Sequence, residues 1–249
     1  SACSKSPAES TGSTATIQRL MQARNLSEEN VIAALKTYTP TGVKDEYYIF
    51  ASGGHSGQLI VIGVPSMRIL KYIAVFTPEP WQGYGYGDQT DALLRSADRD
   101  GKQLNSAYTH PPALSETAGD YDGQYVFIND KANARVAVVS LTDFATKQIV
   151  YSNLIRSDHG ATFVTPNTEY VIEGGQFPAP LDGSYAPIES FQEKYRSAVI
   201  FWKFDREKGR IVPEQSWAIE LPPYMQDLAD AGKLVSDGWM FLNSFNTEM

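Results

Sequence analysis

The sequence predicts an all-β protein with a short helical segment at its N-terminus. Short runs rich in β-branched and aromatic residues recur along most of the chain, and Gly, Pro, Ser or Asn separate them. No long helical pattern lies between these runs, which argues against a parallel βαβ sheet. An aromatic content of 12%, with 19 Gly and 14 Pro, is typical of turn-rich β structure. The strand periodicity alone is compatible with a sandwich, a barrel or a propeller.

The N-terminal residues carry the only cysteine of the chain, Cys3. Residues 1–15 are mostly small and polar, and we expect a flexible leader because they cannot bury enough surface to offset their ordering entropy. The first three residues resemble the end of a bacterial lipoprotein signal, in which Cys3 would carry a lipid anchor. A chance exposed thiol is the alternative. A single cysteine excludes an internal disulfide and a thiolate-rich metal site, so a transition metal bound to this chain would need imidazole ligands.

Residues 16–44 are expected to form a short helical prelude. Ile17 and Leu20 lie on one face of a first helical pattern, and Ser27 is placed to cap a second one. Pro40 marks the end of this second helical pattern.

Residues 45–249 are expected to form the β domain. Residues 78–100 are aromatic, Gly-rich and then charged, which is typical of a long surface loop. Residues 120–123 are expected to form an acidic turn, and the two runs that follow form a hairpin joined by residues 129–133. The runs expected to form strands are residues 47–52, 58–64, 69–76, 125–128, 135–141, 148–151, 162–164, 169–172, 197–204, 210–219 and 240–245.

Charge and motifs exclude several classes of function. A formal net charge of -8, with no concentrated run of Lys and Arg, argues against nucleic acid as a partner. No apolar stretch approaches the roughly 18–20 residues that span a bilayer. No Gly-rich phosphate loop and no nucleophile-elbow motif is present, so neither nucleotide binding nor Ser-His-Asp catalysis is expected.

The three histidines are the main candidates for chemistry. His110 is followed by Pro111 and a second proline, which fix the backbone and leave little entropy to lose on binding. His159 has Asp158 beside it as an expected orienting partner. His55 lies between glycines. For each of the three, a hydrogen-bonded structural histidine is the alternative.

Six segments of the chain resemble the N-terminal propeller domain of the nitrous-oxide reductase family, in the branch exported through the general secretory route. They are residues 51–58 (ASGGHSGQ), 61–73, 75–87, 108–139, 157–171 (SDHGATFVTPNTEYV) and 242–249 (LNSFNTEM). The resemblance extends from about residue 46 to the end of the chain. It implies a seven-bladed β-propeller of four-stranded antiparallel sheets, of which this chain would supply about half. A propeller ring protects its edge strands only when it closes, so we expect a partial chain of a longer protein.

The resemblance implies a copper site. In the family, two adjacent histidines after Asp-Thr bind a sulfide-bridged four-copper cluster whose ligands are all imidazole. The first of these matches His110, and the next cluster histidine matches His159. The second histidine of the pair falls on Pro111 and the family's Asp falls on Tyr108, so the sequence predicts weak or partial copper loading. His55 matches a family histidine that is not a cluster ligand, which favours a structural role.

The resemblance also implies a calcium site at the end of the chain. Phe245 would give its carbonyl oxygen and Glu248 its carboxylate, and such hard oxygen donors suit Ca²⁺. An exposed acid is the alternative. A dinuclear copper centre that receives the electrons is expected on sequence beyond Met249, because this chain lacks the thiolates that the centre requires.

The function implied by the resemblance is the two-electron reduction of nitrous oxide to dinitrogen and water in the periplasm. The expected partners are a c-type cytochrome or a cupredoxin as electron donor, and a second copy in a homodimer. The alternative is a non-catalytic propeller that has lost the cluster and serves as a binding or scaffold module. Pro111 and Tyr108 favour this alternative.

Overall fold

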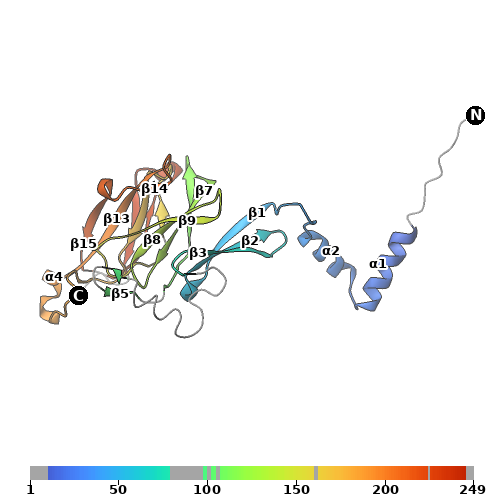
Figure 1. The fold of residues 1–249 in the computed structure, drawn as a ribbon, viewed down its shortest axis with the longest axis horizontal. Helices are drawn as coiled ribbons and strands as arrows, with labels where there is room; N and C mark the ends of the chain where they lie inside the picture. The colour runs from blue at the N-terminus through green and yellow to red at the C-terminus, as the bar shows by residue number, and fades with distance from the viewer. Residues whose placement is uncertain are drawn as a thin grey trace, which may run out of the picture. The chain divides into compact units, whose positions relative to one another are not determined.

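The computed structural model describes residues 11–78, 98–99, 102–104, 107–159, 162–223 and 225–244 (Figure 1). Strands dominate these ranges, and the all-β prediction is confirmed. None of the described helices is long and apolar enough to cross a membrane. Cys3, Phe245, Glu248 and most of the loop predicted at residues 78–100 lie outside the described residues.

The chain divides into two compact units, residues 1–49 with 62–68 and residues 50–61 with 69–249. The first unit contains both predicted helices, α1 (Thr11–Ala23) and α2 (Glu28–Thr37). Ser27 caps α2, because its hydroxyl accepts the N–H of Asn30 while the Asn30 side chain accepts the N–H of Ser27. The helix α1 begins within the stretch for which the sequence predicted a flexible leader.

The first sheet has the order β1-β2-β3. Its strands are β1 (Tyr47–Ser52), β2 (Gln58–Val64) and β3 (Ile69–Ala74), with the short helix η1 (Gly54–Ser56) between the first two. All three strands were predicted. Gly57 ends η1 at φ +72°, and a Cβ on it would lie 3.2 Å from the backbone of Phe76, so no other residue fits this turn without strain.

The second sheet is a meander of four antiparallel strands in the order β6-β7-β8-β9. They are β6 (Ala113–Thr117), β7 (Asp120–Asp130), β8 (Arg135–Ser140) and β9 (Ala145–Tyr151). The predicted hairpin is confirmed as β7 and β8. The predicted acidic turn is wrong, because Asp120 already begins β7. The turn lies at Ala118 and Gly119, whose positive φ angles of +53° and +83° suit a tight hairpin.

The third sheet is built around the long strand β13. Its main path is β10-β11-β13, and β15 pairs with the other edge of β13. The predicted single run at residues 210–219 is interrupted, because Pro213 begins the short helix η3 (Pro213–Gln215). The elements are β10 (Phe163–Val164), β11 (Tyr170–Gly174), β12 (Ala179–Pro180), η2 (Ile188–Ser190), α4 (Phe191–Lys194), β13 (Tyr195–Asp205), β14 (Arg210–Ile211) and β15 (Trp217–Leu221).

A further antiparallel pair follows, β16 (Gln226–Ala231) and β17 (Met240–Ser244), with η4 (Leu234–Ser236) between them. The sequence analysis missed β16, because QDLADA has little β propensity. A short pair, β4 (Asp98–Arg99) and β5 (Lys102–Gln103), precedes the second sheet.

Three apolar clusters lie between successive sheets. Val126 of β7 packs with Leu59 and Ile73 of the first sheet, whereas the neighbouring Phe127 packs with Ile200 and other apolar residues of the third sheet. Successive side chains of a strand point to opposite faces, so β7 contributes to both clusters. A third cluster joins the third sheet to Ala229 of β16. Antiparallel sheets packed face to face in chain order form a β-propeller, which confirms the predicted fold class; the number of seven blades stays a prediction.

Candidate metal-binding site

All three histidines of the chain lie in one row of rings. The imidazole of His55 stacks on Tyr108 at a centroid distance of 4.1 Å and an interplanar angle of 14°. Tyr108 contacts His110 at 4.7 Å, and His110 meets the edge of His159 at 4.4 Å. The structure therefore brings together His110 and His159, as the sequence predicted. It also places His55 and Tyr108 beside them. We call the four residues His55, Tyr108, His110 and His159 the ring row.

The ring row forms where three sheets begin. His110 directly precedes β6, His159 lies shortly before β10, and Asp227 is the second residue of β16. The strand β10 lies beside both β6 and β16. Each of three consecutive sheets thus delivers one polar side chain to the same place. This explains how residues far apart in the sequence meet.

Backbone hydrogen bonds hold the segment that carries Tyr108 and His110. The N–H of Tyr108 donates to Oδ1 of Asp130 at 2.9 Å. Thr109 donates through its N–H and its hydroxyl to the carbonyl of Gly54, at 3.1 and 3.0 Å. The Asp130 carboxylate is itself fixed by Arg135, whose Nε and Nη2 lie 2.9 and 2.5 Å away. The segment is therefore tied to both the first and the second sheet.

His159 is oriented by Asp227, whose Oδ1 contacts Nδ1 of the imidazole. An ionised carboxylate only accepts hydrogen bonds, so the proton of a neutral His159 lies on Nδ1. The Nε2 atom then keeps its lone pair, which is the form that binds a metal.

Asp158 does not take the orienting role that the sequence predicted for it. Its side chain is 1% exposed and lies beside the side chains of Glu173 and Asn129, away from His159. Burial, followed by the charge of the neighbouring Glu173, raises the pKa of Asp158 well above its usual value. The antiparallel bridge between Asp158 and Gly175 turns this side chain into the protein, so the adjacent His159 takes its partner from β16.

His110 has the properties of a metal ligand. Its Nε2 atom is buried and lacks a hydrogen-bond partner among the described residues. Burial, and then the neighbouring His159 and Lys131, lower the pKa of His110 from 6.5 to about 4. The imidazole is therefore neutral at pH 7. A buried nitrogen without a partner is costly, and a bound metal ion would remove this cost.

Within the described ranges, no group of three or more His, Cys, Asp or Glu side chains is arranged to hold a metal ion. The contact between His110 and His159 brings two imidazoles together, which is fewer side chains than such a group needs. Phe245, Glu248 and Cys3 lie outside the described residues, so the calcium site and the lipid anchor stay predictions.

A cavity of about 300 Å³ adjoins the candidate site. Pro111 and Pro112, next to His110, form part of its wall, together with residues of β6, β10 and β16. Glu116 and Lys233 form an ion pair in the same wall.

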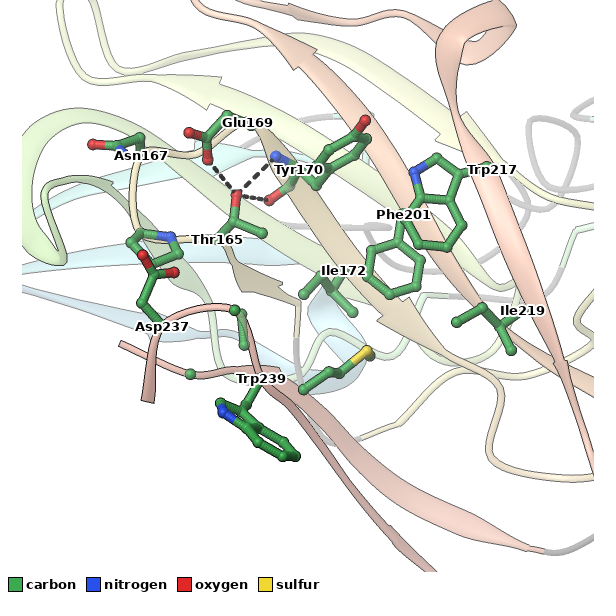
Figure 2. A pocket seen from close by; sticks show the side chains of 15 residues that line it. Thr165, Asn167, Glu169, Tyr170, Ile172, Phe201, Trp217, Ile219, Asp237 and Trp239 are labelled. Atoms are coloured by element: carbon green, nitrogen blue, oxygen red, sulfur yellow. Dashed lines mark hydrogen bonds between the residues drawn. The ribbon is translucent and has the colours of Figure 1, made fainter. Parts of the chain in front are cut away.

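A second cavity, of about 490 Å³, lies elsewhere in the second unit, between the third sheet and the β16-β17 pair. Figure 2 shows the rings of Tyr170, Phe201 and Trp217 on one side of it and Trp239 on another. The Phe201 and Trp217 rings stack at 3.9 Å. None of the histidines lines this cavity, and its lining is mainly apolar, so the ring row is the better candidate for metal chemistry.

Comparisons with known proteins agree with the resemblance found in the sequence. The nitrous-oxide reductase of Pseudomonas fluorescens is 37% identical over 179 residues, which are 71% of this chain and 27% of that protein. The enzyme of Stutzerimonas stutzeri is 37% identical over 62% of this chain, and that of Ralstonia nicotianae is 31% identical over 90% of it. The chain spans about a third or less of the length of these relatives. No protein-family model matches the chain.

Solved structures of low sequence identity are also similar. The β-propeller domain of Cps50 (Swd1) from Myceliophteria thermophila matches with a TM-score of 0.41 and 11% identity, over 74% of this chain and 42% of that chain. Hydrazine synthase from Kuenenia stuttgartiensis matches with a TM-score of 0.39 and 12% identity, over 73% of this chain and 36% of that chain.

Proposed function

Since this chain is a homologue of nitrous-oxide reductases and spans about a third or less of their length, we propose that it is part of a copper enzyme. The full-length protein would reduce nitrous oxide to dinitrogen and water, consuming two electrons and two protons. The observation that carries the proposal is the buried, unpartnered Nε2 of His110, whose ring lies 4.4 Å from that of His159.

The two imidazoles fit the ligand chemistry of a copper-sulfide cluster. His110 and His159 would hold it, since His110 is neutral at pH 7 and His159 keeps Nε2 available. When bound, a cluster of this kind would pass electrons from the donor protein to the substrate. The residues of this chain bind and orient: Asp227 fixes the tautomer of His159, and the prolines after His110 bound a cavity that accommodates a small substrate.

The remaining parts of the proposal concern the protein beyond this chain. The other cluster ligands and a dinuclear copper centre would lie on further sequence. A c-type cytochrome or a cupredoxin would donate the electrons to a homodimer in the periplasm, where a lipid on Cys3 would anchor it. Phe245 and Glu248 would hold a calcium ion.

Copper and sulfide analysis of the full-length protein, purified without oxygen from its native host, tests the proposal. We expect copper and sulfide in the unmodified protein, and most of both to be lost in His110→Ala. Asp227→Asn should lower copper content as well, because the amide cannot fix the His159 tautomer in the same way. Asp143→Asn, at a surface acid that pairs with Lys147, is the control and should retain copper.

The second candidate function is a propeller that acts as a binding or scaffold module without a cluster. Pro111, which offers no donor nitrogen, and Tyr108, which replaces a carboxylate, favour it. An unmodified protein that contains neither copper nor sulfide would support this function and exclude the reductase.

A further inference from the structure

Among the residues that the structure describes, no carboxylate orients His110 in the way that Asp227 orients His159. His159 is held by Asp227, whereas the Nε2 of His110 has no hydrogen-bond partner among the described residues. A ligand imidazole needs a fixed ring orientation before the metal arrives, and otherwise the lost freedom weakens binding. Something other than a carboxylate must therefore limit the ring of His110.

Tyr108 is placed to do this. Residues 108 and 110 are separated by one residue of extended chain, so their side chains point to the same side. The two rings meet at 4.7 Å with an interplanar angle of 60°. The His159 ring also meets His110, at 4.4 Å and 70°. His110 is thus in contact with two rings.

The position of Tyr108 is itself fixed. Its N–H donates to Asp130, and its carbonyl accepts the N–H of Lys131 at 2.9 Å. The ring of His55 covers it at 4.1 Å in a nearly parallel stack. His55 belongs to η1, whose Gly54 carbonyl receives both hydrogen bonds from Thr109. The segment η1 therefore contacts Tyr108 through the His55 ring and holds the next residue, Thr109, through hydrogen bonds to Gly54.

We propose that Tyr108 is a positioning residue for the copper site, and that its ring, backed by His55, replaces an orienting carboxylate for His110. This rests on the proposed function. It assigns a role to the two ring-row members that are not expected to bind copper. It also implies that Tyr108 and His110 act through ring contact, so the phenol oxygen is not required.

Three variants of the full-length protein test this role. Tyr108→Leu removes the ring, and Tyr108→Phe keeps the ring without the hydroxyl. Tyr125→Leu is the matched control, because Tyr125 also contacts a ring, Phe204 at 5.0 Å, but lies away from the site. The measurements are copper content, the electron paramagnetic resonance spectrum of the copper, and the rate at which diethylpyrocarbonate modifies His110 in copper-free protein.

We expect Tyr108→Leu to weaken copper binding about 10- to 100-fold, to change the copper spectrum and to speed modification of His110 several-fold. Tyr108→Phe should match the unmodified protein in all three. Tyr125→Leu should lower the melting temperature while leaving the spectrum and the modification rate unchanged.

The inference is overturned if Tyr108→Leu keeps the spectrum and the modification rate of the unmodified protein, or if Tyr108→Phe behaves like Tyr108→Leu. The proposed function fails separately, if the unmodified protein holds no copper. The modification rate of His110 distinguishes the two failures, since it is measured without copper.

Discussion

Pro111 follows His110 directly and lines the adjoining cavity, so its side chain borders the space beside the candidate site. Proline offers no nitrogen that binds a metal. We expect Pro111→His to raise the copper content of the full-length protein, because it adds an imidazole next to His110. Elemental analysis per chain is the measurement, and Pro187→His, at the remote start of η2, is the control. An unchanged copper content in Pro111→His would show that the missing ligand comes from elsewhere.

Asp122 joins two sheets through its carboxylate. Oδ2 lies 2.5 Å from Nη2 of Arg206 in the third sheet, and Ser115 and Thr117 of β6 also donate to the carboxylate. Burial alone would raise its pKa, but the hydrogen bonds from Ser115, Arg206 and Thr117 outweigh burial and lower the pKa below 3.8.

The lowered pKa gives a pH-dependent stability. The contribution of ionised Asp122 is complete above the unfolded-state pKa of about 3.9, and it is lost as pH falls through the lower folded-state value. We expect Asp122→Asn to lower the free energy of unfolding by about 1.5–3 kcal/mol at pH 7. The gap between variant and unmodified protein should shrink below about pH 4. Urea unfolding across pH measures this, and an equal gap at pH 3 and pH 7 would contradict it.

At the residue scale, the sequence predicted the pairing of His110 and His159 through a family resemblance. It did not predict Asp227 as the partner of His159, because 68 residues separate them and the acids of QDLADA resemble turn residues. Nor did it place His55 against Tyr108. Both contacts depend on how the sheets pack, and no local pattern signals that packing.

At the scale of elements, β7 contributes side chains to two of the apolar clusters. Its Phe127 is fully buried and meets the edge of the Phe204 ring at 5.0 Å. We expect Phe127→Ala to destabilise the protein by about 3–5 kcal/mol, because it leaves a cavity between two sheets. Tyr121→Ala is the matched control on the same strand. Its side chain is 73% exposed, so the change should stay within about 0.5 kcal/mol. Similar losses in the two variants, measured by urea unfolding, would argue against this packing.

The strands most readily predicted were those with β-branched and aromatic alternation. The runs at residues 47–52 and 58–64 coincide with β1 and β2. The polar strand β16 was missed, since pairing with β17 and packing of Ala229 stabilise it rather than local propensity. Tertiary contacts thus decide the elements that the local sequence leaves open.

At the scale of the whole molecule, antiparallel sheets follow one another in chain order, and the chain is homologous to about a third or less of the length of the nitrous-oxide reductases that it matches. Residues at the start of successive sheets meet at one place, as His110, His159 and Asp227 do. The fold therefore brings together polar side chains that no single sheet could supply.

Calcium provides a test at this scale, because a bound ion would tie the segment after β17 to the rest of the full-length protein. An ion that binds only the folded state raises stability by about 2.7 kcal/mol when its concentration is 100 times its dissociation constant. We expect a calcium chelator to lower the melting temperature of the unmodified full-length protein. Glu248→Gln should lower it without chelator and abolish the further effect of the chelator, because the amide lacks the charge that attracts Ca²⁺.

The control for this calcium test is Glu214→Gln, at an exposed acid in η3. It should retain the full response to chelator, because no calcium ligand is expected there. Equal melting temperatures of the unmodified protein with and without chelator would remove the calcium site. A chelator effect that persists in Glu248→Gln would instead place the ion at other residues. In the expected case, the ion would couple the end of this chain to the stability of the whole propeller, because it would bind only the folded state.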